Sequence, residues 1–112
     1  MKIQIKLKID ALIAVSKMLE SIYNLPFSVT SVTENVYISI GYDLADLFDK
    51  KVKTKIKKAD LFDVKKETKF TLKYHEAWAL KKILIELKPY ANNTFIELQL
   101  QKIIDKLDQH GC

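Results

Sequence analysis

Few side chains in this 112-residue sequence have the types and spacing that metal binding or acid–base catalysis requires. Asp43, Asp46 and Asp49 stand three residues apart, so on a helix they drift around the axis and do not converge on one point. A divalent cation would need more oxygen ligands from another element, and the sequence identifies none. Because Lys50 and Lys51 follow directly, we interpret the three aspartates as part of a solvated, salt-bridged helix face.

Cys112 and the two histidines are the other candidates for nucleophilic or metal chemistry. Cys112 is the single cysteine, so the chain cannot form an internal disulfide or a cysteine-based zinc site. With His110 it offers two ligands, fewer than a zinc site needs. His75 stands near the start of an expected helix, where a capping or surface role is usual. Since nucleotide-loop, HExxH, EF-hand and GxSxG motifs are also missing, we expect no catalytic residues, no metal, no cofactor and no enzyme activity.

Binding chemistry has more support, because the basic residues are numerous and unevenly placed. All 19 basic residues are lysine, and 14 acidic residues leave a net charge of +5. Residues 50–73, here called the Lys-rich segment, hold ten lysines and three acidic residues, a net charge of +7, whereas the other residues carry −2. The predicted partner-binding residues are Lys50, Lys51, Lys53, Lys55, Lys57, Lys58, Lys65, Lys66 and Lys69.

Two interpretations of the Lys-rich segment remain open. It is either a solvated connector or edge strand that resists pairing with other chains, or a contact surface for an acidic partner or a phosphate backbone. Lysine lacks the guanidinium fork of arginine, so base-specific readout is disfavoured while non-specific phosphate attraction is not. Five aromatic residues could stack on single-stranded bases, but their spacing favours core positions with polar tips at the surface. They are Tyr37, Tyr42, Tyr74, Trp78 and Tyr90.

Hydrophobic periodicity predicts the elements that carry these residues. Residues 2–8 alternate apolar and polar side chains, which is typical of a strand, and residues 67–73 repeat the alternation. A helix follows each strand: the first begins with Asp10 as N-cap and ends by Pro26, and the second ends at Pro89. The last helix begins at a capping box formed by Thr94 and Glu97 and ends near Gly111.

The remaining helix is less certain from sequence. Apolar residues recur every four positions from Val32 to Phe48, which favours a helix over residues 32–52. Residues 35–41 are rich in β-formers and end at Gly41, so a strand over 35–41 followed by a short helix is the alternative.

Two parts of the chain are similar, either because the chain contains an internal repeat or because any two amphipathic strand-to-helix junctions look alike. Residues 7–22 align with residues 72–87, with five identities and a matching apolar pattern. Each half then reads as a strand followed by two helices, and neither half buries its apolar stripe alone. The identical pairs are Leu7/Leu72, Lys8/Lys73, Ala14/Ala79, Lys17/Lys82 and Leu19/Leu84.

These observations predict a mainly α (α+β) fold. We expect one compact four-helix domain over residues 1–112, with two or three short strands and a pseudo-twofold arrangement of β-α-α halves. The halves would cover about residues 1–58 and 66–112, with the Lys-rich segment connecting them. A hydrophobic content of 48% and a charged content of 29% are typical of soluble globular proteins.

The expected function is that of a non-catalytic protein-binding module. In its length, its lysine and isoleucine content and its lack of a catalytic motif, the chain resembles small accessory proteins of phages and mobile elements. That resemblance implies an inhibitor of a host nuclease or defence complex, hence an acidic or nucleic-acid-handling protein partner. The alternative is sequence-independent nucleic-acid binding through the Lys-rich segment. The sequence shows no signal peptide or membrane span, so we expect a cytoplasmic location and no membrane partner; the oligomeric state stays open.

Overall fold

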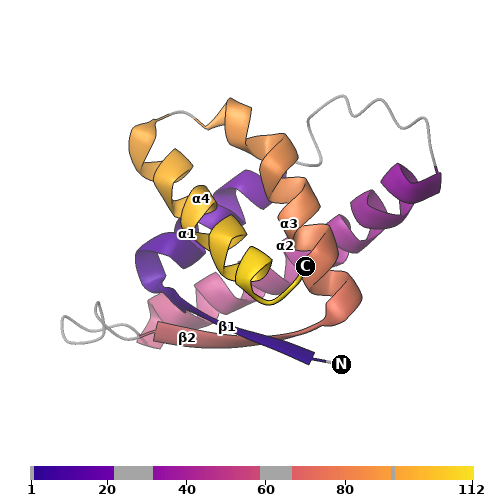
Figure 1. Ribbon diagram of the computed structural model, residues 1–112. Helices are drawn as coiled ribbons and strands as arrows, with labels where there is room; N and C mark the ends of the chain where they lie inside the picture. The colour runs from indigo at the N-terminus through magenta and orange to yellow at the C-terminus, as the bar shows by residue number, and fades with distance from the viewer. Residues whose placement is uncertain (1, 22–31, 59–66, 92) are drawn as a thin grey trace.

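The computed structural model describes residues 2–21, 32–58, 67–91 and 93–112. Two seven-residue strands, β1 (Lys2–Lys8) and β2 (Glu67–Lys73), form an antiparallel sheet. Four helices lie on one side of it: α1 (Ile9–Glu20), α2 (Val32–Lys58), α3 (Tyr74–Leu87) and α4 (Thr94–Gln109) (Figure 1). A 3₁₀ turn, η3 (Lys88–Tyr90), extends α3. The mainly helical fold with a small sheet is thus confirmed, and residues 35–41 are helical.

Each strand continues into its helix without a connecting residue. Lys8 and Lys73 still have extended backbones, with ψ of 159° and 154°, and the next residue is helical. The Lys73 N–H donates to Glu76 Oε1 at 2.8 Å, which satisfies one free donor at the start of α3. The prediction of Asp10 as N-cap was wrong, because α1 already begins at Ile9.

The other helix ends also differ from prediction in detail. The N-cap of α4 is Asn93, one residue before the predicted Thr94, and its Oδ1 accepts from the Ile96 N–H at 2.9 Å. Gly111 lies just past α4 with a φ of +80°, as the sequence predicted, and this left-handed backbone favours glycine. Helix α1 ends at Glu20, well before Pro26.

One hydrophobic core joins both halves of the chain. Both strands alternate exposed and buried residues, so Ile3, Ile5 and Leu7 face the helices together with Phe70 and Leu72. From α2, the Phe48 ring stacks on the Phe70 ring, with centroids 4.6 Å apart and planes at 11°. Helices α1, α3 and α4 add buried apolar rows that belong to the same cluster. The amphipathic sheet face therefore requires the helices of both halves.

The sheet register agrees with the internal repeat. The offset that aligns Leu7 with Leu72 also carries β1 onto β2 from end to end. Ile5 pairs with Phe70, its own equivalent in the repeat, so the local twofold axis of the ladder passes through this pair. Helices α1 and α3 each contact both α2 and α4, as the same twofold requires. The second helices are less alike, since α2 has 27 residues and α4 has 16.

Candidate lysine surface

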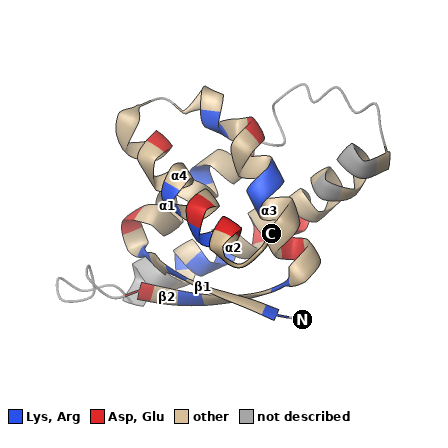
Figure 2. Cartoon of the chain, in the orientation of Figure 1, with Lys and Arg blue, Asp and Glu red and all other residues tan. Residues whose placement is uncertain are grey.

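The outer side of the sheet forms a basic surface. Because side chains alternate along a strand, one face of each strand is buried and the other reaches solvent. The exposed face carries five lysines and one glutamate, a net charge of +4, and we call it the lysine face. Figure 2 marks basic positions along the strands in blue and acidic ones in red. Its residues are Lys2, Gln4, Lys6, Lys8, Glu67, Lys69, Thr71 and Lys73.

The sheet register brings like charges together on this face. Lys6 lies directly opposite Lys69, and Lys2 lies directly opposite Lys73. Like charges at directly opposed positions destabilise a sheet. Among the described residues, no carboxylate forms an ion pair with any of these four ammonium groups. Within the part of the chain that the structure describes, both cross-strand lysine pairs therefore lack a carboxylate partner.

The lysines of α2 have a different environment. Lys50 Nζ lies 3.0 Å from Asp46 Oδ2, and Lys53 Nζ lies 2.9 Å from Asp49 Oδ2, one helical turn away in each case. The hydrogen bond to Asp49 and its negative charge raise the pKa of Lys53. These pairs confirm the predicted salt bridges for Asp46 and Asp49, whereas Asp43 forms no ion pair with the described residues. Their charge is partly cancelled locally, so they add less to an attractive field than the lysines of the sheet.

Lys51 of α2 contacts a buried aromatic ring of the sheet. Its Nζ lies 5.8 Å from the centroid of the Phe70 ring, within the range of a cation–π contact. Because Phe70 belongs to β2, this contact holds an α2 lysine beside the sheet.

The basic surface also continues past β1 onto α4. Lys106 Nζ donates to the backbone carbonyl of Lys6 at 2.7 Å, which fixes this α4 side chain against the strand. Lys102 and Lys106 line, with Lys8 and Glu67, a cavity of about 130 Å³ between α4 and the strands. Lysines from three separate parts of the sequence thus meet at the sheet.

The structure places the described lysines of the predicted partner-binding site on two separate elements. Lys50, Lys51 and Lys53 lie on α2, and Lys69 lies on the lysine face. The side chains of Lys55, Lys57, Lys58, Lys65 and Lys66 lie outside the described residues. The count along the chain placed no excess charge in residues 2–8, yet Lys2, Lys6 and Lys8 lie beside the lysines of β2. The alternation of β1 was visible in the sequence, but its pairing partner was not.

The described residues that were considered for metal binding or for base stacking do not come together in a second site. In the described ranges, no three histidine, cysteine or carboxylate side chains come close enough together to hold a metal ion. Trp78 is partly buried against the core, as predicted. Three tyrosines predicted as core residues are instead 40–58% exposed, and the side chain of Tyr37 is outside the described residues. The three are Tyr42, Tyr74 and Tyr90.

The partly exposed Tyr74 contacts the residues that follow α4. Its hydroxyl donates to the Gly111 carbonyl at 2.7 Å, which ties the residues after α4 to the start of α3.

Comparison with protein-family models, curated proteins and solved structures finds no match to this chain. Among the described helices, none has the length and apolar composition that crossing a bilayer requires.

Proposed function

We propose that the protein is a non-catalytic binding module whose lysine face docks onto an acidic surface of a partner protein. The two uncompensated pairs, Lys6–Lys69 and Lys2–Lys73, carry this proposal. Each costs the free protein some stability, and a carboxylate placed between the two ammonium groups would relieve the repulsion. An acidic partner therefore gains affinity by relieving the repulsion between the paired lysines of the isolated protein.

The composition of the lysine face supports a protein partner. Its eight residues include no aromatic side chain, so it offers no platform on which unpaired bases could stack. Gln4 lies opposite Thr71 at its centre, where both can hydrogen-bond to a partner backbone or side chain. Charge then sets the association rate and orientation, and these polar groups contribute close contacts.

The positive charge of the lysine face also restricts which surface of a partner it can bind. If the partner is a host nuclease or defence complex, the nucleic-acid channel is an unsuitable contact, because such channels are themselves basic. The module would have to bind an acidic surface outside the channel and act by blocking assembly or movement there.

Sequence-independent binding of a nucleic-acid backbone is the second candidate. The same cross-strand lysine pairs favour it, because two ammonium groups side by side can contact one phosphate. The absence of arginine restricts this function to contacts that do not read bases.

Fluorescence anisotropy with two labelled probes separates the candidates. A poly-glutamate peptide and a duplex DNA of similar charge are titrated at about 20 mM and about 150 mM NaCl. Retention of peptide binding at the higher salt with loss of DNA binding supports the acidic partner. The reverse result supports the backbone-binding alternative, and a failure to bind either probe at low salt would contradict both.

Two charge-matched variants locate the surface. K6Q/K69Q removes one cross-strand pair, and K50Q/K53Q removes two lysines that already have aspartate partners. Both lower the net charge by two, so long-range attraction falls equally. We expect the first to weaken peptide binding about tenfold, as loss of close charge contacts does, and the second to have a clearly smaller effect. Equal effects would show that only total charge matters.

A further inference from the structure

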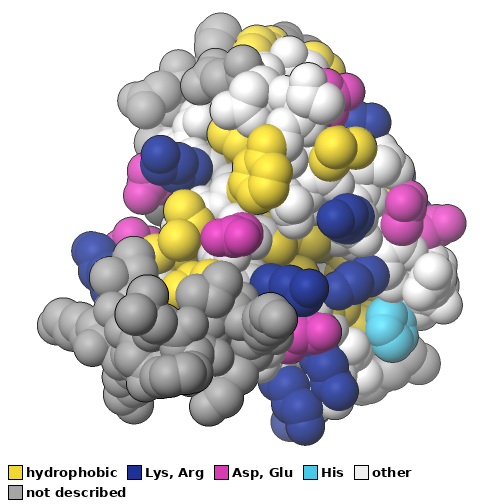
Figure 3. All heavy atoms as spheres, turned by 90° about the vertical axis from the view of Figure 1, so that its left-hand side faces the viewer, with side chains coloured by type: hydrophobic (Ala, Val, Ile, Leu, Met, Phe, Trp, Pro, Cys, Tyr) yellow, Lys and Arg dark blue, Asp and Glu magenta, His cyan; other side chains and the backbone are white. Residues whose placement is uncertain are grey.

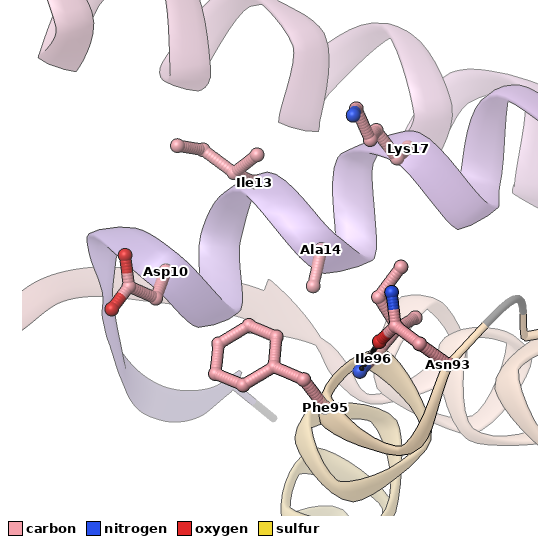
Figure 4. Close-up of a pocket in the computed structure, with 7 residues that line it drawn as sticks. All are labelled: Asp10, Ile13, Ala14, Lys17, Asn93, Phe95 and Ile96. Carbon is pink, nitrogen blue, oxygen red and sulfur yellow. Dashed lines mark hydrogen bonds between the residues drawn. The ribbon is translucent and has the colours of Figure 1, made fainter.

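A groove between α1 and α4 lies outside the lysine face and differs from it in character. Its cavity of about 230 Å³ is lined by Asp10, Ile13, Ala14 and Lys17 of α1, and by Phe95 and Ile96 at the start of α4. In Figure 4 the Phe95 ring lies below α1, with Asp10 toward one end of the groove and Lys17 toward the other. None of the eight residues of the lysine face lines it.

The wall of the groove exposes apolar area that the core does not use. Phe48 and Phe70 are fully buried, whereas Phe95 is 52% exposed. Leu98, one helical turn further along α4 and outside the lining of the cavity, is 54% exposed. Apolar side chains gather beside both acidic and basic ones on the side of the molecule shown in Figure 3, where α1 and α4 lie. Clustered apolar residues with a charged rim are typical of an interaction site.

The two ends of the groove carry opposite charges. Asp10 and Lys17 stand two helical turns apart on α1, so opposite charges flank the apolar centre at a spacing of roughly 10 Å. Within the described residues, neither side chain has an ion-pair partner. A second copy of the chain, placed antiparallel across the groove, brings Asp10 of each copy to Lys17 of the other. A parallel copy would instead oppose like charges.

We propose that the protein forms a twofold-symmetric homodimer through this groove. Two Asp10–Lys17 pairs flank an apolar centre to which both copies contribute Ile13 and Phe95, so the surface is complementary to itself. The dimer carries two lysine faces, and a partner with repeated acidic sites would be held by both at once. This proposal does not depend on the function of the lysine face.

Sedimentation equilibrium tests the dimer directly. From about 1 to about 200 µM, the wild-type mass should rise from 13.0 kDa toward twice that value. F95E should remain monomeric, because it places a charge in the apolar centre. I85E, which alters an exposed apolar residue of α3 outside the groove, should still dimerise. Circular dichroism confirms that each variant is folded.

A charge-exchange experiment tests the antiparallel arrangement. D10K alone opposes two lysines at each end of the interface, and K17D alone opposes two aspartates, so each variant should be monomeric. The double exchange D10K/K17D in one chain should restore the homodimer, because position 10 of each copy, now lysine, would again meet position 17 of the other, now aspartate. In a parallel arrangement the double exchange would still oppose like charges. A wild-type protein that stays monomeric overturns the dimer, as does a dimer indifferent to F95E. A double-exchange variant that stays monomeric while the wild type dimerises overturns the arrangement.

Discussion

Ile5 and Phe70 are cross-strand partners in the ladder, and they are also equivalent positions in the sequence repeat. An antiparallel pair always has a local twofold axis, but nothing requires this axis to coincide with the repeat. The coincidence explains why each half contributes one strand and why α1 and α3 have matching neighbours. The strand register and the neighbours of α1 and α3 are therefore those that an internal repeat would give.

The stacking of Phe48 on Phe70 should be the main contact that holds α2 against the sheet. Phe48 and Phe70 are 0% and 2% exposed, and their rings are in van der Waals contact. We expect F48A to lower the free energy of unfolding by about 3–5 kcal/mol, measured by urea denaturation, because it leaves a cavity against Phe70. Y90A serves as control, since Tyr90 is 58% exposed. Similar losses in both variants would contradict the described packing.

Much of the fold was predictable because its signals are local. Alternation identified both strands to the residue, and four-residue spacing identified α2 despite its β-rich stretch. Gly41 is buried inside α2, so packing outweighs its low helix propensity there. The starts of α1 and α4 were each misplaced by a residue or two, because Lys8 and Asn93 rather than the expected residues precede the helices.

The candidate site was only partly predictable, because it depends on pairing between distant segments. A count along the chain located excess charge in the Lys-rich segment, and Lys69 does lie on the lysine face. The count could not show that Lys6 would stand opposite Lys69, since register is a tertiary property. It also could not show that Lys50 and Lys53 are paired with aspartates.

Exchanging one charge on the lysine face should stabilise the fold. K69E places a carboxylate opposite Lys6 and replaces repulsion by attraction, so the free energy of unfolding should rise by about 0.2–1 kcal/mol. K69Q should give an intermediate value, because it removes repulsion without adding attraction. Thermal denaturation at low salt measures the series. A decrease in stability from Lys to Gln to Glu would show that the two ammonium groups do not repel each other.

The N-cap of α4 should be a separate source of stability. Asn93 Oδ1 accepts the Ile96 N–H, which has no other partner within the helix. N93A should lower the free energy of unfolding by about 1 kcal/mol, whereas N93D should retain the hydrogen bond and favour the positive end of the helix dipole. Chemical denaturation of both variants tests this. If T94A proves more damaging than N93A, the cap is Thr94 instead.

Cys112 should make stability depend on pH. Burial raises the pKa of its thiol, so the folded state keeps the proton at a pH where the unfolded state has lost it. The contribution of the thiol to folding stability is therefore fully present below the thiol pKa of the unfolded state. It declines as the pH rises from that value toward the thiol pKa of the folded state. Between about pH 7.5 and about pH 9.5, the wild type should lose more stability than C112S. Equal losses in urea titrations would show that the thiol does not contribute.

The ladder between β1 and β2 has a consequence for biosynthesis. Lys8 pairs with Glu67, which the ribosome adds about half a chain later. Until then the strand that leaves the exit tunnel first has no neighbour for its backbone, and Ile3, Ile5 and Leu7 have no completed interior to enter. Its interspersed lysines keep this nascent segment hydrated and discourage it from joining strands of other polypeptides during that interval. The lysines that repel one another in the folded sheet thus discourage aggregation of β1 before β2 has been synthesised.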